Sequence, residues 1–567
     1  MSARDEGYIA LSRSNDAEEG VRNADSNNPT EPLLFRSEGG PTPLIVAADG
    51  SYTYSYGPAG LSGLKHNKYA LICALFASIG GLEFGYDQGV IANVLVMQDF
   101  MQRWPVTPLQ KGIMTAVLEL GALVGALAAG IFADRYSRGQ AIIIACVIFL
   151  VGSLFQCAAQ ELSHIFIGRA VGGIGVGALS MLSPLYMAEI SPPEVRGSLL
   201  ALEQLSIVMG VVFGFWTGFA TRDVPGSASW RIPLSLQVPP AILLALGALL
   251  LPPSPRLLVL QHREAEALSS LSRLRLRDQE DPLLQVELLE MKVEAELIRR
   301  AADLAVDEGS RKSGVGHELK AWTKLWDPKW RKRTLVGVGI MVFQQWSGIN
   351  ALLYYGPTLV RSIGFHGDTV SLVVAGGVGI VQFLAVLPAI LFIDRVGRRP
   401  LLRGGSAVMT ASHVSIALLV YLFQSDWPLH PVAAWCAVGG IYMFTAAYGT
   451  SFGPIGWVLP SEVFPLSMRS RGVALSTATN WFNNFLIGLI TPVLMDLSAP
   501  TTFATFAFAC GLAYFWSTHF VPETANVSLE EIDKVFRSDA GREDEHLKSQ
   551  IEDDLGLQQL VRELAEG

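Results

Sequence analysis

Charged residues are scarce in this chain, because Asp, Glu, Lys and Arg together make up only 16% of its 567 residues. Hydrophobic residues make up 50%, which is too apolar for a soluble protein of this length. Cysteines are also few and odd in number. All five lie within apolar segments, which excludes a disulfide framework and favours packing roles. They are Cys73, Cys146, Cys157, Cys436 and Cys510.

The sequence also lacks the residue patterns of an enzyme. It contains no nucleophile–base pair, no metal-ligand cluster and no phosphate-binding loop, so we expect neither catalysis nor a cofactor or metal. No cleavable signal peptide is visible, since the first apolar run begins near residue 69 and follows a long polar tail. The net charge of −9 comes largely from acidic residues in the tails and central loop, and we expect no nucleic-acid partner.

Long apolar runs are what the chain has in abundance. Twelve segments of about 20 residues are apolar enough to cross a bilayer. They span roughly residues 69–97, 112–133, 140–160, 164–188, 199–220, 233–251, 334–361, 370–393, 401–423, 432–460, 472–495 and 502–521. The sequence therefore predicts an all-α membrane protein with twelve transmembrane helices in the lipid bilayer.

Polar stretches divide these segments into two halves. Residues 1–65 are rich in Ser, Asn, Asp, Glu, Gly and Pro, which predicts a disordered tail. Residues 256–333 form the long polar insert, whose helix-like runs predict a helical linker between a first half, 66–255, and a second, 334–521. Residues 522–567 are a C-terminal tail.

Basic residues in the short loops predict the orientation. One side carries nine and the other five, so the side with nine is expected to be cytoplasmic, together with the linker and both termini. We expect the protein to be located in the plasma membrane. The nine are Arg135, Arg138, Arg196, Arg395, Arg398, Arg399, Arg403, Arg469 and Arg471, and the five are Arg103, Lys111, Arg222, Arg231 and Arg361.

Charged motifs recur in the two halves. Asp134-Arg135-Tyr136-Ser137-Arg138 returns as Asp394-Arg395-Val396-Gly397-Arg398-Arg399, and the Glu189–Arg196 spacing returns as Glu462–Arg469. Matching motifs at matching loops predict two six-helix pseudo-repeats with a central site between them. Acid–arginine pairs at the cytoplasmic helix ends are expected to hold neighbouring helices together while the protein is closed on its cytoplasmic side, and to separate when that side opens. The expected gating residues are Glu189, Arg196, Asp394, Arg395, Arg398, Glu462 and Arg469.

One arginine lies inside an apolar segment. Arg169 at the centre of a membrane helix costs roughly 2.5–3.5 kcal/mol on insertion scales, so it is expected to face the bundle interior and pair with an acid. Asp87 is the best candidate. A buried carboxylate beside a guanidinium can gain or lose a proton as its surroundings change, which an ion-coupled carrier requires. The alternative is a static pair that fixes helix register.

These motifs together resemble the sugar porter family of the major facilitator superfamily, over about residues 68–536. The resemblance rests on Arg169 to Arg196, Gln344-Gln345-Trp346-Ser347-Gly348-Ile349-Asn350, Asp394 to Arg399, and Gly453-Pro454-Ile455-Gly456-Trp457 running to Glu462. The overall style, including Phe84 to Val90 and Asn480-Trp481, is most similar to fungal hexose carriers. The resemblance implies the major facilitator fold.

A sugar ring has hydroxyl groups and apolar C–H faces. Its binding site therefore needs amide side chains that hydrogen-bond the hydroxyls and an aromatic side chain that packs against an apolar face. Gln344 and Gln345 are neighbours on one helix face and Asn350 lies further along, where Gly348 and Pro357 favour a broken or bent helix. The resemblance adds Gln204, Trp457, Asn480 and Phe84 as sugar ligands, with Trp481 nearby and Gln382 by position. It also makes Tyr354 and Tyr355 outer-gate residues.

Several residues depart from the family pattern. Ser137-Arg138-Gly139 replaces Gly-Arg-Arg, Pro253 replaces a Glu, and Ala525-Asn526 replace Lys-Gly, which weakens the inner charge network. Gln382 stands where many members have an Asn. Three further intramembrane acids, Glu83, Glu119 and Glu203, have no assigned role. Glu83 is either a second proton site or an acid that reaches a partner elsewhere.

The sequence therefore predicts a carrier that moves a monosaccharide, most simply a hexose, inward together with a proton. A facilitator that uses the same site is the runner-up. A third interpretation, a transporter-like nutrient sensor, is disfavoured because only 46 residues follow the last predicted helix, 567 − 521. The sequence does not determine the oligomeric state.

Overall fold

The computed structural model describes residues 33–35, 44–46, 52–57, 60–132, 137–307, 322–328, 330–364, 368–464, 468–524, 536 and 540–566. It divides into two compact units, Met1–Tyr54 with Gln558–Gly567, and Ser55–Leu557. The smaller unit holds an antiparallel sheet in the order β1-β2-β3 and most of α26 (Leu557–Glu566). The strands are Leu33–Phe35, Leu44–Val46 and Tyr52–Thr53. Most of the tail predicted to be disordered lies outside the described residues, so that expectation stays a prediction.

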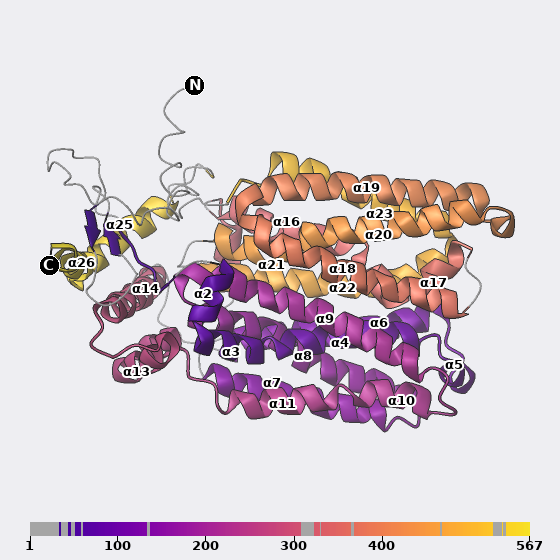
Figure 1. Cartoon of the computed structure of the whole chain (residues 1–567), viewed down its shortest axis with the longest axis horizontal. Helices are drawn as coiled ribbons and strands as arrows, with labels where there is room; N and C mark the ends of the chain where they lie inside the picture. The colour runs from indigo at the N-terminus through magenta and orange to yellow at the C-terminus, as the bar shows by residue number, and fades with distance from the viewer. Residues whose placement is uncertain are drawn as a thin grey trace. The chain divides into compact units, whose positions relative to one another are not determined.

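The larger unit is a bundle of long helices, drawn in Figure 1 from indigo and magenta in the first half to orange and yellow in the second. Ten helical stretches in the described residues are long and apolar enough to cross a membrane, and α22 and α23 complete the predicted twelve. Several spans consist of two shorter helices in sequence. The predicted helical membrane fold is thus confirmed.

The first half contains six spans. They are α3 and α4 (Lys68–Ala77 and Ile79–Val94), α6 (Pro108–Phe132), α7 (Arg138–Cys157), α8 (Leu162–Ile190), α9 (Arg196–Thr221), and α10 with α11 (Ala228–Ser235 and Val238–Ala248). α8 packs between α6 and α7. Glycines allow this close approach: a Cβ at Gly125 of α6 would lie 2.0 Å from the carbonyl oxygen of Ile174.

The second half repeats this plan. Its spans are α16 with α17 (Arg331–Trp346 and Ile349–Ser362), α18 (Asp368–Val396), α19 (Arg398–Phe423), α20 with α21 (Pro431–Thr450 and Phe452–Val463), α22 (Arg469–Leu497) and α23 (Ala499–His519). The break between α16 and α17 falls at Gly348, whose φ of +94° is in the region that favours glycine. The broken helix expected around this glycine is confirmed.

Three helix pairs make the most extensive contacts between the two halves in the described part of the chain. α6 packs against α22, α9 against α18, and α4 against α17. The first two pairs are equivalent to each other, because each joins the second span of one half to the fifth span of the other, as expected for an internal repeat. Polar side chains on the facing sides of these six helices lie at the junction between the halves, which is where a central site is expected.

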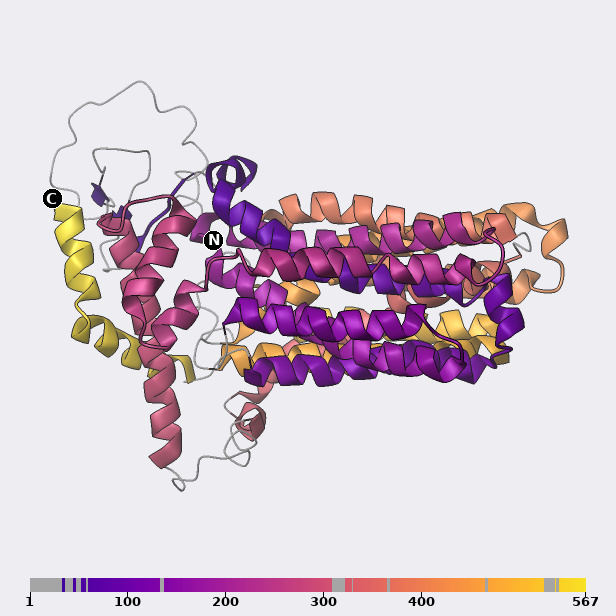
Figure 2. The same cartoon turned by 90° about the horizontal axis from the view of Figure 1, so that it is seen from below.

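Further helices flank the bundle at its two ends. Beyond one end, which we call the linker end, lie α12 (Pro255–Leu260), α13 (Glu264–Arg275) and α14 (Pro282–Asp307), as Figure 2 shows. α2 (Gly60–His66), η1 (Pro193–Val195), η2 (Lys324–Trp326) and α25 (Ala540–Asp554) lie in the same unit. At the opposite end, which we call the loop end, lie α5 (Gln98–Arg103) and η3 (Trp427–Leu429).

A buried ion pair attaches the linker to the bundle. Arg275 of α13 donates to the carbonyl oxygen of Ile190, at the end of α8, over 2.8 Å. The same guanidinium pairs with Glu287 of α14 at 2.6 Å. The hydroxyl of Tyr56 also donates to Glu287, over 2.7 Å. Because these three side chains are buried, the contacts join α8, α13 and α14 into one packed unit with the segment before α2.

Candidate functional site

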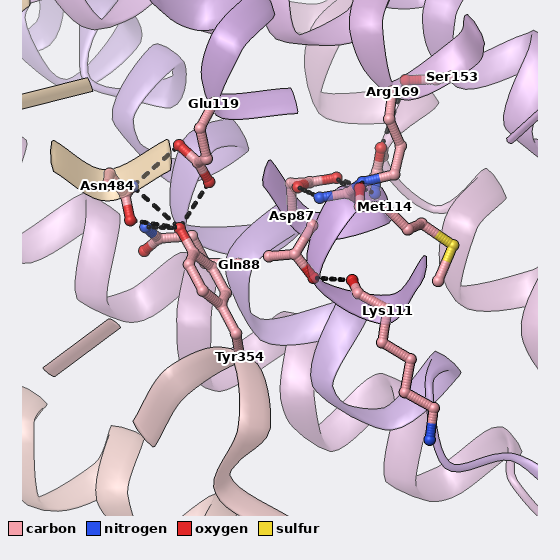
Figure 3. A network of polar contacts seen from close by, with 11 residues as sticks. Asp87, Gln88, Lys111, Met114, Glu119, Ser153, Arg169, Tyr354 and Asn484 are labelled. Carbon is pink, nitrogen blue, oxygen red and sulfur yellow. Dashed lines mark hydrogen bonds and ion pairs between the residues drawn. The ribbon is translucent and has the colours of Figure 1, made fainter. Parts of the chain in front are cut away.

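The buried arginine of α8 pairs with the acid of α4, as predicted. Arg169 Nη1 and Nη2 each lie 3.3 Å from one carboxylate oxygen of Asp87, and the two side chains are 0% and 2% exposed. Arg169 Nε donates over the shorter distance of 2.7 Å to the carbonyl oxygen of Met114 in α6 (Figure 3). The backbone of α6 thus positions the guanidinium independently of the carboxylate.

A third side chain also reaches the carboxylate. Gln237 Nε2 donates to Asp87 Oδ1 over 3.4 Å, and Ser153 of α7 donates to the other end of the same amide over 3.3 Å. Gln237 lies at the start of α11 and is fully buried. No sequence pattern indicated this contact, since α7 and α11 meet Asp87 only after the half has packed.

The amides of the second half form a cluster near the break in the seventh span. Asn480 Nδ2 of α22 donates to Gln344 Oε1 over 2.6 Å, and Gln344 Nε2 donates to the carbonyl oxygen of Phe452 over 2.9 Å. The hydrogen bond from Gln344 to Phe452 links α16 to the junction of α20 and α21. Both amide side chains are buried. The structure therefore brings together two of the predicted sugar ligands.

A second set of amides continues this cluster towards the first half. Asn350 Nδ2 donates to Gln345 Oε1 over 2.5 Å and to Asn484 Oδ1 over 2.8 Å. Asn484 was not among the predicted site residues. It lies one helical turn after Asn480, and this i, i+4 spacing on a polar face was the available signal.

The hydroxyl of Tyr354 connects these amides with the first half. It lies 2.6 Å from Glu119 Oε1 on α6 and 3.2 Å from Asn484 Oδ1, and Gln88 Nε2 donates to it over 3.0 Å (Figure 3). Tyr355 donates instead to the carbonyl oxygen of Gly488 over 2.6 Å. The two tyrosines thus hold α17 against α4, α6 and α22.

A pair of aromatic side chains forms another contact between the two halves. Trp481 of α22 is fully buried among residues of the first half, and its Nε1 donates to Ser180 Oγ over 3.2 Å. Its ring meets the ring of Phe84 edge to face at 4.8 Å. The structure therefore brings these two predicted residues together, with the indole packed across the boundary between the halves.

Three predicted sugar ligands lie apart from these clusters. Gln204 of α9 and Gln382 of α18 are buried, and Trp457 of α21 is half-buried. Within the described residues, none of the three hydrogen-bonds to the amides above, and Gln382 Oε1 has no partner. Their role in sugar binding stays a prediction.

Acid–arginine pairs lie at the linker end of both halves. Arg138 of α7 pairs with Glu189 of α8 at 2.7 Å, and Arg398 of α19 pairs with Glu462 of α21 at 2.8 Å. The equivalent partners confirm the internal repeat, but each pair joins helices of one half. Arg138 was missing from the predicted gating residues, although its counterpart Arg398 was included. The side chains of Asp394, Arg395 and Arg469 lie outside the described residues, and Arg196 is half-buried.

The C-terminal motif contacts the second pair. Glu523 accepts hydrogen bonds from the backbone N–H groups of Arg398 and Arg399, over 2.8 and 3.1 Å, at the start of α19. A carboxylate there also complements the helix dipole. Thr524 donates to Glu462 over 2.6 Å. In the first half Pro253 stands in place of the corresponding acid, so the charge contacts of the two halves differ.

Two of the unassigned acids have carboxylate oxygens that are not hydrogen-bonded in the part of the chain that the structure describes. Both carboxylate oxygens of Glu83 and Oε2 of Glu203 are buried without a hydrogen bond in the described structure. Glu83 lies one turn before Asp87 on α4, yet Arg169 contacts only the latter. In the described residues Glu83 thus reaches no polar partner on another helix. Its role as a second proton site stays a prediction.

The comparisons with known proteins agree with this architecture. Residues 73–536 match the family model described as "Sugar (and other) transporter". The chain belongs to this family. The resemblance to sugar porters, and with it the twelve-helix major facilitator fold, is thereby confirmed.

Individual relatives cover the same region. The glucose transporter GlcP of Staphylococcus epidermidis is 31% identical over 479 residues, which are 84% of this chain and 99% of that protein. Hexose transporter 2 of Kluyveromyces lactis is 32% identical over 485 residues, 82% of each chain. A structure of the proton:xylose symporter XylE bound to 6-bromo-6-deoxy-D-glucose has a TM-score of 0.66 and 25% identity, covering 82% of this chain and 99% of that one.

Proposed function

We propose that this chain moves a monosaccharide, most simply a hexose, across the membrane by alternating access, in symport with a proton bound at Asp87. The family and its glucose- and hexose-transporting relatives support sugar as the substrate class. The similarity to a proton:xylose symporter supports proton coupling. No enzymatic step is part of this proposal.

One observation carries the proposal. The buried amides of the second half and the ion pair of the first half belong to neighbouring networks at the junction of the halves. Gln88, the residue after Asp87, donates to Tyr354, and Asn484 joins that hydroxyl to the amide of Asn350. The ion pair is thus connected to the amides through the backbone of α4 between Asp87 and Gln88 and through the hydrogen bonds of Tyr354 and Asn484.

The amides supply the chemistry that a sugar needs. Gln344, Gln345, Asn350 and Asn480 each carry both a donor and an acceptor, as each hydroxyl of a sugar does. Two of their present hydrogen bonds join them to one another, Asn350 to Gln345 and Asn480 to Gln344, so a sugar hydroxyl replaces an amide partner there rather than leaving one unpaired. Unpaired buried polar groups cost about 1–3 kcal/mol each, which makes this exchange important for binding.

The carboxylate of Asp87 supplies the proton site. Protonation removes its charge and weakens its attraction for Arg169, while the carbonyl oxygen of Met114 still holds the guanidinium. We propose that the outward-facing carrier takes up a proton and then sugar, and that the inward-facing carrier releases both and restores the pair. The linker end is the cytoplasmic end in this scheme, with both termini inside, and the plasma membrane is the proposed location.

A facilitator is the second candidate, and one observation favours it. Asp87 is already satisfied by Arg169 and Gln237, which is also what a fixed pair that sets helix register requires. Such a carrier equilibrates sugar across the membrane without concentrating it.

Uptake by the purified protein in liposomes decides between these functions. A panel of radiolabelled hexoses, pentoses and polyols is offered with and without an inward proton gradient. Accumulation above the external concentration only with the gradient supports symport. Saturable uptake that stops at equal concentrations under both conditions identifies a facilitator, and no saturable uptake of any sugar contradicts the proposed function.

A further inference from the structure

Glu119 is a buried acid that the proposed cycle leaves unused. It lies in the middle of α6 and is 0% exposed. Burying a carboxylate is costly unless hydrogen bonds satisfy it. Both of its oxygens are satisfied, since Tyr354 donates to Oε1 over 2.6 Å and Asn484 Nδ2 donates to Oε2 over 2.9 Å.

Both donors belong to the other half of the bundle. Tyr354 lies on α17 and Asn484 on α22, whereas Glu119 lies on α6 of the first half. Figure 3 shows the carboxylate pointing at the tyrosine hydroxyl, with Gln88 of α4 on the other side of that hydroxyl. One carboxyl group thus connects the two halves at the helix that carries the predicted outer gate.

The charged and titratable groups around Glu119 come from three helices. Arg169 of α8 and Asp87 of α4 are paired with each other, and Tyr355 of α17 donates to a backbone carbonyl. Tyr354 contacts it directly, and the contact from α22 is the neutral amide of Asn484. In the part of the chain that the structure describes, Glu119 forms no ion pair. Its charge state is therefore free to change without breaking one.

The hydrogen bonds of this cluster depend on the charge of Glu119. Tyr354 has one hydroxyl proton and two acceptors within reach, Glu119 Oε1 at 2.6 Å and Asn484 Oδ1 at 3.2 Å. An ionised carboxylate attracts that proton and the amide of Asn484 together. A protonated carboxyl group accepts fewer hydrogen bonds and must itself donate, so its bonds become neutral ones, which are roughly half as strong.

We propose that Glu119 is a proton-sensitive latch on the outer gate: the ionised carboxylate holds Tyr354 and α17 shut, and protonation from the loop end releases them. The direction of this effect rests on the proposed function, in which the loop end faces the outside. The proton arrives on one carboxylate oxygen and leaves from it again, and no other bond is made or broken. External acid therefore favours the gate-open carrier.

The latch is also connected to the proposed sugar site. Asn484 Oδ1 accepts from Asn350, which also donates to Gln345. A sugar hydroxyl that takes over the amide of Asn350 changes the bonds available to Asn484, and through them the donors of Glu119. Sugar occupancy and the latch therefore act on the same tyrosine.

Hydrogen–deuterium exchange tests the latch without any sugar. Exchange of the backbone amides of α17 is measured at pH 5 and pH 8 in the purified full chain, corrected for intrinsic exchange and compared with α20. The expected wild-type result is exchange at least several-fold faster at pH 5 in α17, and on the order of tenfold if one charge-assisted bond is lost. Equal corrected rates at the two pH values overturn the proposal.

Three variants assign the effect to this carboxyl group. Glu119→Gln removes the charge with little change of shape, so α17 is expected to exchange fast at both pH values. Tyr354→Phe removes the hydroxyl and is expected to do the same, with no added effect in the double variant. Glu161→Gln, which neutralises an exposed acid at the loop end, is the matched control and retains the wild-type response. A pH response that persists in folded Glu119→Gln contradicts the latch.

Transport assays separate failure of the latch from failure of the proposed function. Proton binding at Asp87 also makes sugar affinity depend on external pH, so this assay uses sugar exchange in the Asp87→Asn background. If the latch exists, the external sugar concentration for half-maximal sugar exchange changes with external pH in Asp87→Asn and stays constant in the Asp87→Asn/Glu119→Gln double variant. A normal exchange response without sugar uptake contradicts the proposed function and leaves the latch standing. Uptake with an unchanged exchange response contradicts the latch alone.

Discussion

Asp87 and Arg169 face each other through two N–O distances of 3.3 Å, whereas Arg169 Nε lies 2.7 Å from the carbonyl oxygen of Met114. Charge-assisted hydrogen bonds are usually about 2.7–2.9 Å long. The guanidinium is therefore bound more closely by the backbone of α6 than by its acidic partner. A carboxylate held in this way can lose its charge without displacing the arginine.

Replacing Asp87 by Asn imitates the protonated state permanently. We expect Asp87→Asn to keep sugar binding and exchange between sugar pools, and to lose all accumulation driven by a pH gradient. Counterflow and gradient-driven uptake in the same liposomes measure the two activities. Asp223→Asn, at an exposed acid, is the matched control. Accumulation by Asp87→Asn when only a proton gradient is supplied would falsify the assignment.

Removing an amide of the proposed sugar site lowers affinity. Asn350→Ala and Gln345→Ala each delete a hydrogen bond to a sugar hydroxyl, which is worth about 0.5–1.5 kcal/mol net and about 1–3 kcal/mol if the hydroxyl stays unpaired. We expect sugar affinity to fall roughly 3- to 100-fold while the protein still inserts and folds. Binding titrations on folded protein measure this, with the exposed amide variant Gln424→Ala as control. Unchanged affinity means that the sugar binds elsewhere.

The linker pair makes stability depend on pH. Burial alone raises the pKa of Glu287, but Arg275 and the Tyr56 hydroxyl outweigh it and hold the pKa below its usual 4.5. An acid with a lowered pKa stabilises the fold fully above its unfolded value, and this contribution is lost as pH falls through the lower folded value.

We therefore expect Glu287→Gln to lower the thermal unfolding midpoint at pH 7, because breaking a buried pair costs about 3–5 kcal/mol. Below pH 4.5 the difference from the wild type should shrink. Melting curves in detergent between pH 3 and 8 measure it, with exposed Glu280→Gln as control. A difference that stays constant over this range contradicts the role given to the charge.

The proposed orientation predicts an unmodified sequon. Asn526-Val527-Ser528 is an Asn-x-Ser pattern in the C-terminal tail, which the proposal places in the cytoplasm, so it should carry no glycan. The mass of the protein expressed in a eukaryotic host is measured before and after glycosidase treatment. A glycosidase-sensitive shift that disappears in Asn526→Gln would place the linker end outside.

Much of the fold was predictable because the bilayer requires long apolar helices. The segments around Arg169 and Gln344 were identified from apolar length, and the break at Gly348 from local backbone preference. A charge within an apolar run needs a partner, so the pairing of Arg169 with Asp87 also followed from sequence. The repeated motifs indicated two equivalent halves, which the equivalent partners of Arg138 and Arg398 confirm.

The contacts between helices were decided by tertiary packing alone. Nothing in the order of residues indicated that Gln237 reaches Asp87, or that Tyr354 and Asn484 both donate to Glu119. These partners lie on different helices, and their meeting depends on how the helices rotate and how closely small residues let them approach. The sequence by itself determined which polar groups lie within the membrane, because each is costly there. Only the folded bundle determined which of them satisfy one another.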